Sequence, residues 1–284
     1  MPFTALISTS QLEQNLHNPE WVIVDCRSSL LDHSAGLKAY RKGHIPNAIF
    51  ANLEEDLSSP VTELSGRHPL PDFDSLIQKL GSWGINNQTQ IVAYDDAGGA
   101  YAVRLWWQLR TFGHESIAVL DGGIPQWERE NKPLDQKPPK VNEETFTALI
   151  NKTTWLSSEQ IEKNLSTNEF LVLDARTAER YRGEFEPIDT VAGRIPNSVN
   201  RAFQLNLNEQ GLFLSAEELR QQFKAIVELS PNKSPEKIVH LCGSGVTACH
   251  NMLAMELAGY KNSKLYAGSW SEWIRDKNRP VATG

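Results

Sequence analysis

A short stretch that occurs twice decides the fold, first as Val22-Ile23-Val24-Asp25-Cys26-Arg27 and again as Val172-Leu173-Asp174-Ala175-Arg176. Each copy is an apolar, β-branched run followed by an aspartate and an arginine, which is typical of a buried parallel strand and its carboxyl end. Three further pairs of blocks follow in the same order: Gly43–Ala48 with Gly193–Ser198, Ile91–Tyr94 with Ile238–Leu241, and Asp121–Trp127 with Ala267–Trp273. Two repeats of this length predict two similar domains rather than a solenoid.

Each repeat alternates strand patterns with helix patterns. Strands are predicted at Trp21–Asp25, Gln90–Tyr94, Ile117–Leu120, Phe170–Asp174, Lys237–Leu241 and Ser263–Tyr266. Helices are predicted at Ala100–Phe112 and Thr247–Ala258, and Ser215-Ala216-Glu217-Glu218 has the pattern of a capping box that opens another. This alternation predicts an α/β fold with two tandem domains, each a parallel sheet flanked by helices on both faces.

The join between the repeats is polar and rich in proline from Glu130 to Lys140. Such a segment stays extended and is a candidate linker. We therefore expect a first domain over residues 1–130, a linker over 131–153 and a second domain over 154–284.

Composition narrows the class of protein. The 284 residues carry a net charge of -7, which argues against a nucleic-acid-binding or acidic-membrane surface. No apolar run reaches the length of a membrane span, and no secretory signal begins the chain, so we expect a cytoplasmic protein. The three cysteines are Cys26, Cys242 and Cys249; they form no C-x-x-C pair, so neither a disulfide framework nor a metal site is expected.

One of these cysteines directly follows a predicted strand. Cys242 is followed by Gly243-Ser244-Gly245-Val246-Thr247 and then by the predicted helix. The backbone N–H groups of a glycine-rich turn can converge on one atom, and a helix N-terminus adds partial positive charge. Both effects favour the nucleophilic thiolate, so we expect a reactive thiol at Cys242 in an anion-cradling loop formed by Gly243, Gly245, Val246 and Thr247. In the first repeat Asp95 stands at the corresponding position, so the thiol is not duplicated.

The run Cys-Gly-Ser-Gly-Val-Thr-Ala-Cys, Cys242 to Cys249, resembles the active-site loop of two-domain rhodanese-like sulfurtransferases, above all the 3-mercaptopyruvate sulfurtransferases. Matching blocks include Asp25-Cys26-Arg27, Gly43-His44-Ile45-Pro46, Asp174-Ala175-Arg176 and Gly268-Ser269-Trp270-Ser271-Glu272-Trp273. The resemblance covers nearly the whole chain. It implies an inactive N-terminal rhodanese domain and a catalytic C-terminal one.

The resemblance also implies a reaction. Cys242 takes a sulfane sulfur from a small-molecule donor as a persulfide and passes it to a thiol acceptor, such as thioredoxin or a small thiol, or to cyanide. No cofactor or metal is required. Thiosulfate-specific relatives carry basic residues just after the cysteine, whereas this chain has Gly243 and Ser244, which favours 3-mercaptopyruvate as the donor. Thiosulfate as donor, or a persulfide carrier without turnover, remains the alternative.

Further site residues follow from the same resemblance. Ser244 can donate a hydrogen bond or a proton to a leaving enolate, and Arg180 matches the substrate-binding arginine of the family. The second arginine that those enzymes carry after a Glu-Pro pair is Ile188 here, so Arg182 or Arg194 is expected to replace it. His68 is a candidate proton relay with Ser244.

Other reaction classes fit less well. A cysteine phosphatase needs an arginine six residues after the nucleophile, and that position is Ala248. Gly243-x-Gly245-x-x-Ala248 is a weak dinucleotide-binding match too near the C-terminus. No Gly-x-Ser-x-Gly of a serine hydrolase is present.

Overall fold

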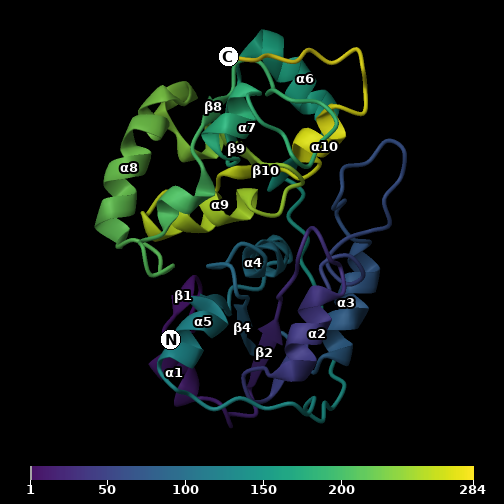
Figure 1. Cartoon of the computed structure of the whole chain (residues 1–284), viewed down its shortest axis with the longest axis vertical. Helices are drawn as coiled ribbons and strands as arrows, with labels where there is room; N and C mark the ends of the chain where they lie inside the picture. The colour runs from purple at the N-terminus through teal and green to yellow at the C-terminus, as the bar shows by residue number, and fades with distance from the viewer. Residues whose placement is uncertain (1) are drawn as a thin grey trace. The chain divides into compact units, whose positions relative to one another are not determined.

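The computed structural model describes residues 2–284, which form two compact units (Figure 1). The first unit holds the chain up to Ser59, Leu70–Asn151 and Glu209–Phe213, and the second holds Pro60–Pro69, Lys152–Asn208 and Leu214–Gly284. Two short segments are exchanged between the units: Pro60–Pro69 belongs to the second unit and Glu209–Phe213 to the first. The expected linker belongs to the first unit as far as Asn151. The domain boundaries at 130 and 154 stay a prediction.

The first unit is built on a five-stranded sheet in which every neighbouring pair is parallel, in the order β1-β5-β4-β2-β3. Its strands are β1 (Leu6–Ile7), β2 (Trp21–Asp25), β3 (Ala48–Phe50), β4 (Gln90–Tyr94) and β5 (Ile117–Leu120). Its helices are α1 (Thr9–Glu13), α2 (Ala35–Lys42), α3 (Phe73–Ser82), α4 (Ala102–Thr111) and α5 (Gly123–Arg129).

The second unit repeats this topology strand for strand, in the order β6-β10-β9-β7-β8 and again all parallel. Its strands are β6 (Trp155–Leu156), β7 (Leu171–Asp174), β8 (Val199–Asn200), β9 (Ile238–Leu241) and β10 (Lys264–Tyr266). Its α-helices are α6 (Ser158–Thr167), α7 (Ala178–Arg182), α8 (Ala216–Leu229), α9 (Ala248–Leu257) and α10 (Ser269–Trp273), and short 3₁₀ turns lie at Phe203–Asn206, Pro231–Lys233 and Pro235–Lys237.

The middle strands β4 and β9 are buried along their whole length, which shows that both faces of each sheet are covered. In β4, Val92 and Tyr94 join a core with α1 and α5, whereas α4 packs on the sheet as well. In the second unit, Val239 and Leu241 of β9 pack with Trp270 and Trp273 of α10, and α9, which lies against α8, covers β9 and β10 (Figure 1). The predicted fold class is confirmed.

The repeated aspartate–arginine pair makes the same contacts in both units. The Arg27 guanidinium forms a buried bidentate pair with Asp25 and donates to the carbonyl of Gly43 at 2.7 Å. Arg176 does the same with Asp174 and the carbonyl of Gly193 at 2.8 Å. Each pair ties the end of a central strand to the Gly-x-Ile-Pro turn. Losing one partner of such a buried pair costs about 3–5 kcal/mol.

The six predicted strands are all present, with ends within one residue of the prediction. The predicted helices are α4 and α9, and the Ser215–Glu218 capping box opens α8. The edge strands were missed because β1, β6 and β8 have two residues each and β3 has three, too few to show a period.

Candidate active site

The turn that carries Cys242 joins the carboxyl end of β9 to α9 in the second unit. Gly245 adopts a φ of +76°, and a Cβ there would collide with the backbone carbonyl of Ala267. Only glycine fits both the left-handed backbone and this close approach. The turn is consequently tight, and the Cys242 side chain is 2% exposed.

Three hydrogen bonds fix Cys242. The Gly245 N–H donates to its Sγ at 3.2 Å, and the Cys242 N–H donates to the hydroxyl of Ser269 at 3.1 Å. The Trp270 N–H donates to the Cys242 carbonyl at 3.0 Å. Ser269 itself has a φ of +55° and donates to the Tyr266 carbonyl at 2.9 Å, so its hydroxyl is oriented toward the cysteine backbone.

Ser244 and His68 form the second feature of the site. The His68 Nδ1 lies 2.7 Å from the Ser244 Oγ, and both side chains are buried. His68 reaches the loop because Pro60–Pro69 is one of the exchanged segments and belongs to the second unit. The structure thus brings together the two residues named for a proton relay, and the relay itself stays a prediction.

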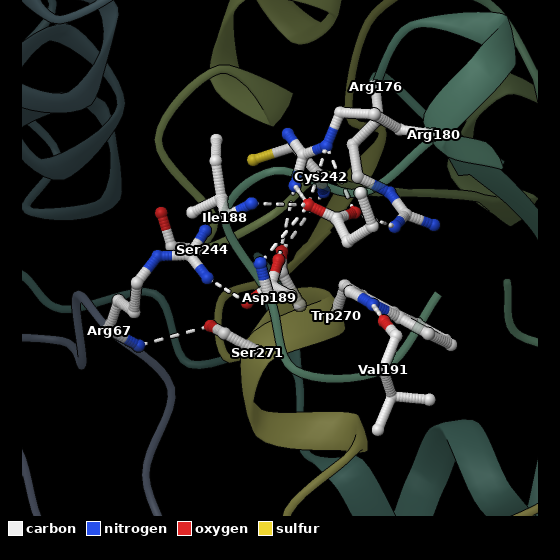
Figure 2. Close-up of polar contacts among 12 residues, drawn as sticks. Arg67, Arg176, Arg180, Ile188, Asp189, Val191, Cys242, Ser244, Trp270 and Ser271 are labelled. Atoms are coloured by element: carbon white, nitrogen blue, oxygen red, sulfur yellow. Dashed lines mark hydrogen bonds and ion pairs between the residues drawn. The ribbon is translucent and has the colours of Figure 1, made fainter. Parts of the chain in front are cut away.

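Arg180 belongs to a network of charged side chains near the loop (Figure 2). Its Nε and Nη2 donate to Glu186, and Nη2 also donates to Asp189 at 3.1 Å. Burial alone would raise the pKa of Glu186, but the hydrogen bonds from Arg180 and from the Asp189 N–H hold that pKa below its usual range. Burial raises the pKa of Asp189, with Glu186 adding to the rise.

Arg67 lies beside the cysteine loop, a position that the sequence did not reveal. Its Nη1 pairs with Asp189, so Asp189 bridges Arg67 and Arg180 with one oxygen on each (Figure 2). Both guanidinium groups face Gly243: a Cβ on that glycine would lie 2.6 Å from the Arg67 Nη2 and 3.5 Å from the Arg180 Nη2. Arg67 directly precedes His68 in the sequence, but a local pattern does not show that its partner is Asp189, more than a hundred residues away.

The other two expected arginines make different contacts. Arg182 pairs with Glu184 at 2.7 Å, and both side chains are well exposed. Arg194 donates to the carbonyl of Gly284 at 2.6 Å and lies over the ring of Tyr181. The guanidinium groups of Arg67 and Arg180 lie beside Gly243, whereas Arg182 and Arg194 make the contacts just described. The expected role of Arg182 or Arg194 in binding the donor stays a prediction.

The equivalent loop of the first unit is filled by a carboxylate. Asp95 follows β4 and is fully buried. Its Oδ1 accepts from the N–H groups of Ala97 and Gly99 at 2.8 Å, and its Oδ2 accepts from those of Tyr101 and Ala102 at 2.8 and 2.9 Å. The repeated turn therefore holds a carboxylate through four backbone N–H groups in one unit and a sulfur atom through one in the other.

The remaining thiols are buried. Burial raises the pKa of Cys26 well above its usual range, and Asp25 and Asp95 add to the rise. Cys249 is buried in α9 and its thiol donates to the Gly245 carbonyl at 3.4 Å. Among residues 2–284 no group of three or more metal-ligating side chains is found, and no helix there has the length and apolarity to cross a membrane.

A family model described as "Rhodanese-like domain" matches this chain twice, over residues 8–130 and 157–276. The chain belongs to the rhodanese-like family. It is 43% identical to a probable 3-mercaptopyruvate sulfurtransferase from Pseudomonas aeruginosa, over the full length of both chains. It is 35% identical to a thiosulfate sulfurtransferase from Rattus norvegicus, over 96% of this chain and 93% of that one.

A solved structure is also similar over most of the chain. The 3-mercaptopyruvate sulfurtransferase from Leishmania major superposes with a TM-score of 0.83 at 27% identity, covering 95% of this chain and 74% of the other. This rhodanese-like chain is therefore a sulfurtransferase with two rhodanese domains.

Proposed function

We propose that this sulfurtransferase takes its sulfur from 3-mercaptopyruvate and carries it as a persulfide on Cys242. The observation that carries the proposal is the hydrogen bond from the Gly245 N–H to the Cys242 Sγ, next to the Ser244–His68 pair. A backbone N–H aimed at sulfur stabilises negative charge there, both on the thiolate and on the persulfide formed from it.

The reaction has two half-reactions. The Cys242 thiolate attacks the donor sulfur; the S–S bond forms, the C–S bond breaks, and its electron pair leaves with the enolate of pyruvate. The enolate carbon then takes a proton, and Ser244, hydrogen-bonded to His68, is positioned to supply it. In the second half-reaction an acceptor thiolate attacks the outer sulfur, giving an acceptor persulfide and restoring the Cys242 thiolate.

The choice of donor rests on two observations. Gly243 and Ser244 put no charged side chain directly after the cysteine, and the guanidinium groups of Arg67 and Arg180 lie in front of Gly243. A carboxylate can bind bidentately to such groups while its thiol approaches Cys242. The probable 3-mercaptopyruvate sulfurtransferase among the relatives adds support.

Thiosulfate is the second candidate donor. Relatives named thiosulfate sulfurtransferase share 35% identity, and Ile188 stands where the mercaptopyruvate enzymes resembled by this chain carry an arginine. The proposed acceptor is a thiol, thioredoxin or a small thiol. The proposed location is the cytoplasm, where cysteines stay reduced, and Cys26, Cys242 and Cys249 form no disulfide. The first unit, with Asp95 in its cradle, is proposed to carry no sulfur.

Intact mass tests the persulfide. After treatment with 3-mercaptopyruvate the wild-type protein is expected to gain the mass of one sulfur atom, and dithiothreitol is expected to remove it. Cys242→Ser is expected to gain nothing, whereas Cys26→Ser serves as the matched control and keeps the gain. A gain that survives in Cys242→Ser would overturn the assignment.

A further inference from the structure

Arg67 is anchored on the second unit at two points. Its backbone N–H donates to the Ser271 hydroxyl at 3.0 Å, and its Nη1 pairs with Asp189, whose side chain is 4% exposed. Two anchors fix both the start and the end of a long side chain, which removes most of its rotamer freedom in advance of binding.

One nitrogen of this guanidinium, Nε, remains without an acceptor in the described part of the chain. The Arg67 Nε is buried and has no hydrogen-bond partner among residues 2–284. A buried donor left unpaired costs about 1–3 kcal/mol, so such an atom at a reactive site points to an absent ligand. The Nε–H and one terminal N–H of an arginine form a parallel fork that fits the two oxygens of a carboxylate.

The fork lies beside the cysteine loop. The Arg67 Nη2 is the atom nearest to the Cβ position of Gly243, and both terminal nitrogens of Arg180 lie within 4 Å of that position. Because residue 243 has no side chain, the two guanidinium groups can approach the residue that directly follows Cys242. Asp189 holds them together by accepting from both.

We propose that Arg67 is a specificity-determining residue, which binds the carboxylate of the sulfur donor through its Nε–Nη2 edge together with Arg180. The inference rests on the proposed function, since it names what selects a carboxylate donor at the same site. In this proposal Arg67, which precedes His68, supplies the second guanidinium that binds the carboxylate. The enzyme therefore needs no arginine at position 188, where it has Ile188.

The test compares two alkylating reagents that differ only in charge. Iodoacetate carries a carboxylate and iodoacetamide does not, and both alkylate the Cys242 thiolate. The intrinsic reactivities of the two reagents are the same in every variant, so a change in the ratio of their rates between variants reports carboxylate binding. Rates are measured by peptide mass mapping of Cys242 in the full chain. The ratio of iodoacetate to iodoacetamide is expected to fall about tenfold in Arg67→Gln, the factor for one charge-assisted hydrogen-bonded fork.

Two variants keep the result interpretable. Arg67→Lys keeps the charge but loses the fork, and its ratio of iodoacetate to iodoacetamide rates is expected to lie between those of wild type and Arg67→Gln. It also provides the test if Arg67→Gln folds poorly. Arg41→Gln, which changes an exposed arginine of α2 in the first unit, is expected to keep the wild-type ratio. An unchanged ratio in Arg67→Gln, or an equal slowing by both reagents, would overturn the proposal.

The same proteins separate this inference from the donor assignment. With 3-mercaptopyruvate, Arg67→Gln is expected to raise KM about tenfold while kcat changes less. A wild-type protein that forms no persulfide with 3-mercaptopyruvate contradicts the proposed function, and the alkylation ratio still decides the role of Arg67.

Discussion

Asp95 and Cys242 occupy the same place in two copies of one turn. The carboxylate of Asp95 accepts four backbone N–H groups, and the sulfur of Cys242 accepts the N–H of Gly245. The duplicated scaffold therefore aims backbone N–H groups at the first residue of the turn in both units, and that residue is a cysteine only in the second unit. Asp95 is a structural anion, and its contribution should appear in folding stability.

Asp95→Ala is expected to destabilise the protein by about 3 kcal/mol or more, because four buried donors lose a charged acceptor at once. Urea unfolding monitored by tryptophan fluorescence measures the loss. Asp96→Ala, at the exposed neighbouring position, is the control and should change stability by less than about 0.5 kcal/mol. Equal losses in the two variants would contradict the role of the Asp95 cradle.

Gly245→Ala should destabilise the second unit and slow the modification of Cys242. The added Cβ meets the Ala267 carbonyl at a φ of +76°, so the turn must move and carry its N–H away from the sulfur. Gly211→Ala is the matched control, since Gly211 has a φ of +77° with nothing within 4 Å.

The control isolates the cost of the left-handed backbone, about 1–2 kcal/mol, whereas Gly245→Ala adds the steric clash and is expected to cost several kcal/mol. Thermal unfolding and iodoacetamide rates measure both effects. Similar melting temperatures for the two variants would show that the close approach to Ala267 is unimportant.

Ser244→Ala should lower the rate of persulfide formation from 3-mercaptopyruvate by about a hundredfold, because the leaving enolate loses its proton source. Thiosulfate releases sulfite, which needs no proton on carbon, so its single-turnover rate should change less than about threefold. Rapid-quench mass spectrometry measures both rates, and His68→Gln should give the same difference between the donors. An equal loss of rate with both donors would instead show that Ser244 maintains the shape of the loop and supplies no proton.

His240, two residues before Cys242, is expected to control acid stability. It is fully buried, neither ring nitrogen has a hydrogen-bond partner among the described residues, and burial, with the nearby Arg201 charge, lowers its pKa to about 3. The unfolded chain binds a proton near pH 6.5 and the folded chain only near pH 3, so stability falls as the pH drops through this window.

The full loss of folding stability between the two pKa values is about 5 kcal/mol. His240→Leu should flatten the stability curve between pH 6 and 4, measured by urea midpoints across that range, whereas the control His17→Leu, at an exposed position, should keep the wild-type slope. A wild-type slope in His240→Leu would mean that other groups set the acid limit.

The central strands and the cysteine turn could be predicted from the sequence, because β4 and β9 are buried throughout and consist mostly of apolar residues. The fork of Arg67 could not, since its position depends on an exchanged segment and on Asp189, more than a hundred residues away. A local pattern carries no record of such a pairing. For the same reason the sequence cannot separate Arg67 from Arg182 and Arg194. Both of the latter lie near Arg180 in the sequence, but in the structure Arg182 pairs with Glu184 and Arg194 donates to the Gly284 carbonyl.

The most direct test of the account is kcat/KM for 3-mercaptopyruvate and for thiosulfate, measured on one preparation with cyanide as the acceptor. Arg67, Arg180 and the Ser244–His68 pair together predict a preference of at least about tenfold for 3-mercaptopyruvate, since only that donor has both a carboxylate to bind and an enolate to protonate. A preference for thiosulfate would contradict the account and make this rhodanese-like protein a thiosulfate sulfurtransferase.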